Sequence, residues 1–274
     1  MFPFFYFYVE YIFKQIVDSS MNLRKTTIKG EQYLISAKEN KDDYFGGAYS
    51  LLKKMFVEMT QLAKAYHSTK FDFVDYPFAY RERQLDSLML PALSKLCKGI
   101  VIAEYPVERQ YKLDDDKRQD IYKSSGRVDY WCIYKGYSFV IEVKHAYDNP
   151  SNQSTTDALK QRWLYMNATQ LQTIKKYLSS FGEATNGIIR LGLLFVSSYM
   201  KENKRENDLR TELKRISQDI CTKKPTKTTP DFVAGWEINT KFMENKNGDG
   251  LFYPSFMLIS KVFSPIKHNG GKNK

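Results

Sequence analysis

The sequence GRVDYWCIYKGYSFVIEVK, residues 126–144, reads as two strands joined by a tight turn. Both halves are rich in aromatic and β-branched residues, which favour strands. The Lys135-Gly136 pair between them is a plausible two-residue hairpin turn. Folding the second strand back on the first would bring Asp129 near Glu142, which follows it by thirteen residues.

Charged side chains would then gather at one edge of the sheet. Because side chains alternate between the two faces of a strand, Glu142 and Lys144 point the same way, while Val143 points into a core. Asp129 joins them from the neighbouring strand. His145 is expected at the surface of the strand end. Carboxylate pairs suit Mg²⁺ or Mn²⁺, because Mg²⁺ prefers oxygen ligands and keeps several waters for chemistry.

The arrangement resembles the PD-(D/E)xK nuclease superfamily, whose members share the element order helix, three strands, helix, strand. The same order can be read here over residues 80–198. The expected elements are a helix over 80–90, strands over 99–105, 126–134 and 137–144, a helix over 157–181 and a strand over 190–196. The resemblance implies an α/β fold with a restriction endonuclease-like core (αβββαβ), in which a mixed sheet is flanked by helices.

Two further features support the resemblance, and one departs from it. Gln161 and Tyr165, in the run QRWLY, are similar to the QxxxY signature of RecB-like members. They lie one helical turn apart, so both can point toward the edge that carries the carboxylates. Glu82 stands on the first helix, where family members often carry a glutamate that contacts the metal site through water. Val128 occupies the place of the motif's proline.

The resemblance implies a metal-dependent nuclease that hydrolyses phosphodiester bonds of DNA. Asp129 and Glu142 would bind one or two Mg²⁺ ions, with the Val143 carbonyl as a further ligand. Lys144 would orient the attacking water and help to neutralise the developing negative charge. The expected products are a 5′-phosphate and a 3′-hydroxyl.

The composition agrees with a globular protein that has a polyanionic partner. The chain has 274 residues, of which 42% are hydrophobic, and a net charge of +11. A sizeable core can therefore form, and nucleic acid is the simplest partner for the positive charge. Its three cysteines are widely spaced, which argues against a disulfide framework and a CxxC zinc site. The sequence has no Gly-rich phosphate loop, so nucleotide hydrolysis has no support.

Residues 1–20 are almost wholly aromatic at their start. Three interpretations stay open: a helix packed on the domain, a weak membrane-surface anchor, or a translated leader upstream of Met21. Glu10 and Lys14 interrupt the run before it reaches membrane-spanning length. We therefore expect that the protein has no stable membrane span and that it is cytoplasmic.

The remaining segments are expected to flank the core within one domain. Apolar residues recur at helical spacing over 43–67, which predicts a helix packed outside the core. The expected divisions are an N-terminal helical region over 21–79, the nuclease-like core over 80–198, a C-terminal extension over 199–266 with a helix over 201–220 and strands over 236–243 and 252–262, and a disordered basic tail over 267–274.

Two other classes of function stay open. A binding module of nuclease-like fold would hold nucleic acid without metal-dependent turnover. A membrane-associated interaction protein would use the aromatic N-terminus and would pellet with lipid vesicles. The sequence does not distinguish DNA from RNA, or cutting at ends from internal cutting. It is compatible with a homodimer and with a partner protein that supplies targeting.

Overall fold

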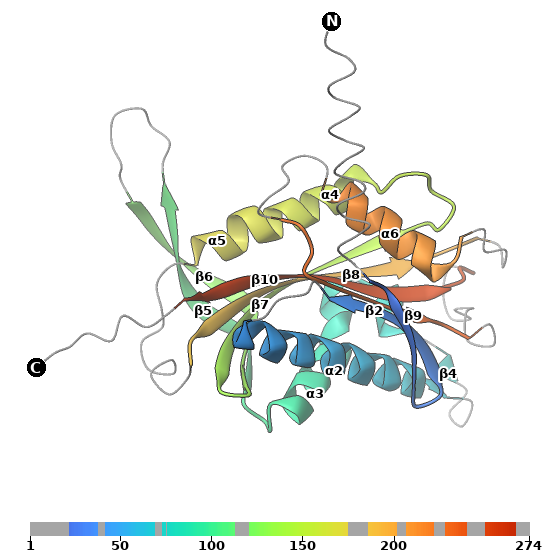
Figure 1. Cartoon of the computed structure of the whole chain (residues 1–274), viewed down its shortest axis with the longest axis horizontal. Coiled ribbons are helices and arrows are strands. Elements are labelled where there is room, and N and C mark those ends of the chain that lie inside the picture. The colour runs from blue at the N-terminus through green and yellow to red at the C-terminus, as the bar shows by residue number, and fades with distance from the viewer. Residues whose placement is uncertain are drawn as a thin grey trace, which may run out of the picture.

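In the computed structural model, a mixed sheet of eight strands lies between two layers of helices (Figure 1). The strands are β1 (Arg24–Ile28), β2 (Glu31–Ala37), β5 (Val101–Lys112), β6 (Ile121–Tyr134), β7 (Tyr137–Asp148), β8 (Ile188–Ser198), β9 (Phe232–Glu237) and β10 (Ser255–Ile266). Their order across the sheet is β1-β2-β9-β10-β8-β7-β6-β5. The structure describes residues 22–37, 42–68, 73–74, 76–112, 121–174, 186–201, 207–221, 228–239 and 250–266.

Helices cover both faces of this sheet. They are α2 (Asp43–Tyr66), α3 (Asp86–Leu96), α4 (Asp157–Leu164), α5 (Leu171–Thr173) and α6 (Leu209–Asp219), with the 3-10 turns η2 (Pro77–Ala79) and η3 (Glu82–Leu85) and the π-helix η4 (Tyr165–Gln170). The pair α2 and α3 lies on one face, and α4, α5 and α6 lie on the other (Figure 1). Two short strands, β3 (His67–Ser68) and β4 (Phe73–Val74), pair with each other apart from the sheet. The predicted mixed α/β class is confirmed.

The elements from α3 to β8 follow the predicted order. The strands β5, β6 and β7 form two successive antiparallel hairpins, and β8 lies parallel to β7 after a crossover through α4. The turn between β6 and β7 is the predicted one. Lys135 has φ 47° and Gly136 has φ 76°, and a two-residue type I′ turn requires positive φ at both positions.

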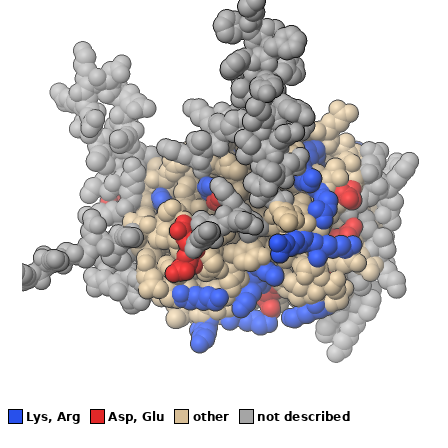
Figure 2. Space-filling model, viewed as in Figure 1, with Lys and Arg blue, Asp and Glu red and all other residues tan. Residues whose placement is uncertain are grey.

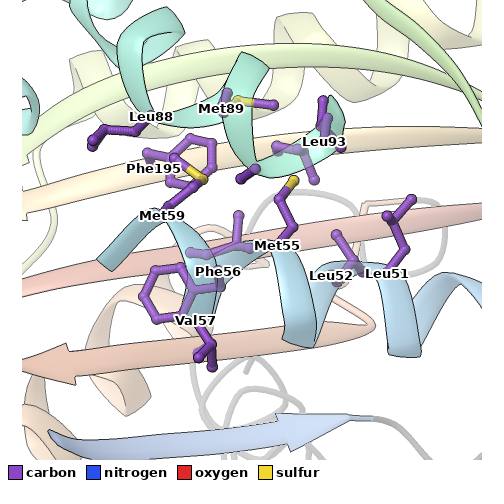
Figure 3. Close-up of a cluster of buried hydrophobic side chains, with 14 of the residues drawn as sticks. Leu51, Leu52, Met55, Phe56, Val57, Met59, Leu88, Met89, Leu93 and Phe195 are labelled. Atoms are coloured by element: carbon purple, nitrogen blue, oxygen red, sulfur yellow. The ribbon is translucent and has the colours of Figure 1, made fainter. Parts of the chain in front are cut away.

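The apolar layer under α2 fixes α3 against the sheet. Burying one Leu, Met or Phe side chain contributes about 1.5–3 kcal/mol relative to leaving it exposed. Because α3 follows η3 directly, this packing also holds Glu82 in place. The side chains labelled in Figure 3 are Leu51, Leu52, Met55, Phe56, Val57 and Met59 from α2, Leu88, Met89 and Leu93 from α3, and Phe195 from β8.

Three predicted elements near the core have wrong boundaries. The segment expected as one helix over 80–90 begins as the 3-10 turn η3 and becomes α3 only at Asp86. The strands β5 and β6 run beyond their predicted ends at 105 and 126, because they continue as a two-stranded ribbon. A ribbon can carry charged side chains on both faces, so its charges do not mark strand ends.

The helical expectation for residues 21–79 holds for α2 but not for the segment before it. Residues 24–37 form the hairpin of β1 and β2 at one end of the sheet. Its turn residues Lys29 and Gly30 have φ 51° and 81°. This is the same Lys-Gly turn that joins β6 and β7, so the sequence contained a signal for the hairpin.

The C-terminal extension completes the same sheet, with shifted boundaries. The helix α6 begins at Leu209 instead of 201, because Asp208 caps it by accepting a hydrogen bond from the Thr211 N–H at 2.8 Å. The strands β9 and β10 pair with each other, and β9 also pairs with β2. The aromatic segment 1–20 and the tail 267–274 lie outside the described residues.

Among the described helices, none combines the length and the apolar character needed to cross a membrane.

Candidate active site

The candidate site lies where β6 and β7 separate. Their ladder runs from Tyr134 opposite Tyr137 to Tyr130 opposite Ile141 and then ends. Beyond this point the Asp129 Oδ2 accepts a hydrogen bond from the Val143 backbone N–H at 2.6 Å. The carboxyl group of Asp129 thus takes the place that a strand carbonyl has in a regular ladder, and this bond holds it against β7.

On its other side, Asp129 lies at a break in the ladder between β5 and β6. Asp129 and Glu104 fall opposite each other, but the register skips both. Glu104 has φ 52°, in the left-handed region that non-glycine residues seldom occupy. Residues two apart on a strand ordinarily share a face, yet Val128 packs under α4 to α6 and Tyr130 under α2 and α3. At this break the backbone of β6 rotates, so that the side chains of Val128 and Tyr130 point to opposite faces of the sheet.

Glu142 is buried on β7 with a basic partner from β5. It is 1% exposed, and its Oε1 accepts a hydrogen bond from the Arg109 guanidinium. The Gln170 Nε2 donates to its other oxygen, Oε2, at 3.4 Å. Burial and then the negative charge of Asp129 raise the pKa of Glu142 to about 7, against the opposing effects of Arg109 and Lys144.

The carboxyl groups of Asp129 and Glu142 lie close enough for each to change the pKa of the other. Burial raises the pKa of Asp129, while the Val143 N–H, the charge of Lys144 and the hydrogen bond with Glu142 act to lower it. Two neighbouring carboxyl groups do not ionise independently, because the negative charge of one opposes ionisation of the other.

This donor set fits a hard divalent cation. The two carboxyl groups present oxygen ligands side by side, and the Val143 carbonyl lies next to Glu142 in the chain. Among the described residues, no group of three or more His, Cys, Asp or Glu side chains is arranged to hold a metal. A cation bound here would therefore complete its shell with a carbonyl and water, which Mg²⁺ readily accepts.

Lys144 and Glu82 lie together, and the charges of both act on Asp129. The Lys144 Nζ donates to the Val143 carbonyl at 2.7 Å and lies 3.4 Å from the Glu82 Oε1. The other Glu82 oxygen accepts from the His145 backbone N–H at 3.2 Å. Glu82 is thus tied to β7 through both oxygens, although it stands on η3 and not on an α-helix.

The two residues of the QxxxY motif are placed differently from the acid pair. Gln161 and Tyr165 are both exposed, and the Tyr165 side chain is 57% exposed. Within the described part of the chain, no hydrogen bond joins either residue to Asp129 or Glu142. The expected helix over 157–181 also changes at Tyr165 into the π-helix η4, and residues 175–181 lie outside the described residues.

Other residues of that helical segment reach the site instead. The Gln170 side chain, at the end of η4, contacts Glu142, and the Arg162 guanidinium donates to the His145 carbonyl. A π-helix adds a residue to its turn and rotates the following side chains, so helical spacing counted from Asp157 does not identify Gln170.

His145 is buried, which corrects the expected surface position. It is 2% exposed, and its Nε2 lies 2.9 Å from the Ser197 Oγ, which donates to the Phe78 carbonyl at 2.6 Å. Burial and then the charge of Arg162 lower the pKa of His145 to about 4, so the ring is neutral at pH 7. Its place is structural: it joins β7, β8 and η2.

No family model, no curated protein and no solved structure matches this chain. The assignment of function therefore depends on the residues and geometry described above.

Proposed function

We propose that this protein is a metal-dependent nuclease of the PD-(D/E)xK type. One observation carries the proposal: where two strands separate, the Asp129 carboxyl group binds the Val143 N–H next to Glu142, and the charges of Asp129, Glu142 and Lys144 act on one another. The order α3-β5-β6-β7-α4-β8, with β8 parallel to β7, supports a restriction endonuclease-like core. Neither feature depends on the loosely matched motif position at Val128.

In the proposed mechanism, Asp129, Glu142 and the Val143 carbonyl would hold Mg²⁺ or Mn²⁺. A bound divalent cation supplies a Lewis acid that lowers the pKa of a coordinated water. The carbonyl has a second lone pair besides the one that accepts from Lys144, so it can serve both partners. Lys144 supplies positive charge against the negative charge that develops on the phosphate.

The remaining residues of the site keep this arrangement in place. Glu82 accepts from Lys144 and from the His145 N–H, so it orients the ammonium group relative to β7. Gln161 and Tyr165 are exposed, which suits contact with the substrate more than contact with the carboxyl groups. Their assignment to the catalytic set is part of the proposal.

The proposed substrate is DNA. The chain carries a net charge of +11, and basic side chains cover more of the face in Figure 2 than acidic ones do. Positive charge of this kind attracts the phosphate backbone without reading its sequence. The positive net charge supports a polyanionic partner, and the acid pair supports hydrolysis of that partner.

The test is cleavage of linear, circular and single-stranded DNA with Mg²⁺, Mn²⁺ or EDTA. We expect cutting that requires the metal and that falls by at least about 100-fold in the Lys144→Ala variant, because this removes a charge that stabilises the transition state. Lys54→Ala, at an exposed position of α2, is the matched control and should cut like the wild type. Cutting that EDTA leaves intact would contradict the proposal.

A second candidate is a binding module that holds nucleic acid without cutting it. The observation that favours it is the contact between Arg109 and Glu142, since a guanidinium already neutralises one of the two carboxyl groups. Tight, salt-sensitive DNA binding without metal-dependent cutting would support this candidate. The same cleavage experiment, extended with binding assays at two salt concentrations, separates the two.

A further inference from the structure

We propose that Arg109 is a positioning residue that holds Glu142 for cation binding, an inference that rests on the proposed function. Arg109 lies on β5, outside the motif that identified the site, and is 7% exposed. A buried guanidinium is costly unless its N–H groups are satisfied and its charge is paired. The contacts of Arg109 meet both conditions.

The Arg109 side chain joins four elements. One Nη donates to the Glu142 Oε1 on β7 and to the Arg127 carbonyl on β6, the latter at 2.8 Å. The other Nη donates to the Gln170 carbonyl in η4 at 2.5 Å. Because Gln170 also donates through its side chain to the Glu142 Oε2, the guanidinium and the carboxyl group are fixed by a shared neighbour.

The strand between Arg109 and Glu142 is shaped to let the side chain pass. A Cβ added to Gly126 on β6 would lie 2.7 Å from the Arg109 Nε and 3.1 Å from its Cδ. Real Cβ atoms essentially never approach a neighbour so closely, so no other residue fits at position 126 without moving the guanidinium. The position of the Arg109 side chain therefore depends on the sequences of both β5 and β6.

This arrangement divides the two oxygens of Glu142 between two tasks. The Oε1 is committed to Arg109, while the Oε2 accepts only the long hydrogen bond from Gln170 at 3.4 Å and so keeps a lone pair for a cation. The guanidinium also supplies the charge that allows a carboxylate to persist at 1% exposure. Partners that orient a metal ligand in this way typically change metal affinity by about 10- to 100-fold when removed.

The test measures Mn²⁺ binding to the full chain, by the electron paramagnetic resonance signal of free Mn²⁺, independently of cleavage. We expect Arg109→Gln to weaken Mn²⁺ binding by at least about 10-fold. Arg109→Lys should lose less, because it keeps the charge but not the branched donor set. Unchanged Mn²⁺ binding in Arg109→Gln would overturn the inference. Tighter binding would also overturn it, because Arg109 would then compete with the cation.

A second variant displaces Arg109 without changing any charge. Gly126→Ala should weaken Mn²⁺ binding by several-fold, while its matched control Gly46→Ala, with no atom within 4 Å of the added Cβ, should not. Circular dichroism of each variant establishes that it folds. If Arg109→Gln does not fold, the comparison of Gly126→Ala with Gly46→Ala decides, and equal Mn²⁺ affinity in these two variants would overturn the inference.

The binding assay also separates failure of this inference from failure of the proposed function. If the wild-type protein binds no Mn²⁺, or if Asp129→Asn binds Mn²⁺ as well as the wild type does, the metal site itself is absent and both proposals fail. If the wild type binds Mn²⁺ and Asp129→Asn abolishes this, but every Arg109 and Gly126 variant binds equally well, the proposed function stands and the role of Arg109 is refuted.

Discussion

The carboxyl group of Asp129 accepts the backbone N–H of Val143 at 2.6 Å and so joins β6 to β7 where their ladder ends. One residue therefore has two tasks, because the same carboxyl group also meets Glu142. A substitution at Asp129 changes both the backbone hydrogen bond and the acid pair. A replacement that keeps the backbone hydrogen bond but removes the carboxylate separates the two effects.

Asp129→Asn should separate chemistry from stability. The amide oxygen still accepts the Val143 N–H, so we expect the free energy of unfolding to change by less than about 1 kcal/mol. Asp129→Ala leaves that N–H without its partner, and its loss should cost about 1–3 kcal/mol. Cleavage should be lost in both variants. Urea unfolding and a cleavage assay check this, and equal destabilisation by Asn and Ala would refute the role of the hydrogen bond.

Glu142→Gln should change the pH dependence of stability. The pKa of Glu142 is about 7 in the folded protein, above its ordinary value of 4.5, so the folded state binds more protons between these values. In the wild type this destabilises the fold as pH rises from 4.5 to 7, by about 3 kcal/mol at most. Glu142→Gln removes that dependence.

The measurement is the difference in unfolding free energy between Glu142→Gln and the wild type at several pH values. The variant should gain on the wild type as pH rises from 4.5 to 8. The substitution also removes the contact with Arg109, which shifts the difference at every pH, so the trend and not the sign at one pH is decisive. A flat difference across this range would show that Glu142 titrates normally.

Protonation of His145 should act in the opposite direction. Its folded pKa of about 4 lies below the ordinary value of 6.5, so the unfolded state binds more protons between these values. The stability that the neutral ring contributes is complete above pH 6.5 and is lost as pH falls to about 4, by about 3 kcal/mol at most. His145→Asn should therefore be less sensitive to acid than the wild type. Unfolding of both proteins between pH 4 and 7.5 tests this, and parallel curves would contradict it.

The local parts of the site were predictable from the sequence, but its surroundings were not. Strand periodicity and the Lys135-Gly136 turn are short-range signals, and they sufficed to bring Asp129 near Glu142. The reach of Arg109 depends on the long ribbon of β5 and β6. The reach of Gln170 depends on the π-helix that begins at Tyr165. Both result from tertiary packing, which leaves no periodic trace in the chain.

Gly192 should be required for this π-helix. It lies on β8 beside Glu142 in the parallel ladder, and an added Cβ would lie 2.3 Å from the Asn167 Oδ1. Asn167 is fully buried in η4, so it cannot move toward solvent. Gly192→Ala should therefore destabilise the fold by about 1–3 kcal/mol, whereas the control Gly46→Ala should not. Thermal unfolding measures this, and a neutral Gly192→Ala would mean that η4 shifts at little cost.

Gln161 and Tyr165 provide the sharpest test of whether the QxxxY resemblance has functional content. Both side chains are exposed, and the hydrogen bonds described for Asp129 and Glu142 come from other residues. Gln161→Ala and Tyr165→Phe should therefore leave the free energy of unfolding within about 0.5 kcal/mol of the wild type. If they contact the substrate, cleavage should fall by about 10-fold or more while Mn²⁺ binding stays unchanged. Normal cleavage in both variants would leave the acid pair and Lys144 as the site and remove the RecB-like motif from it.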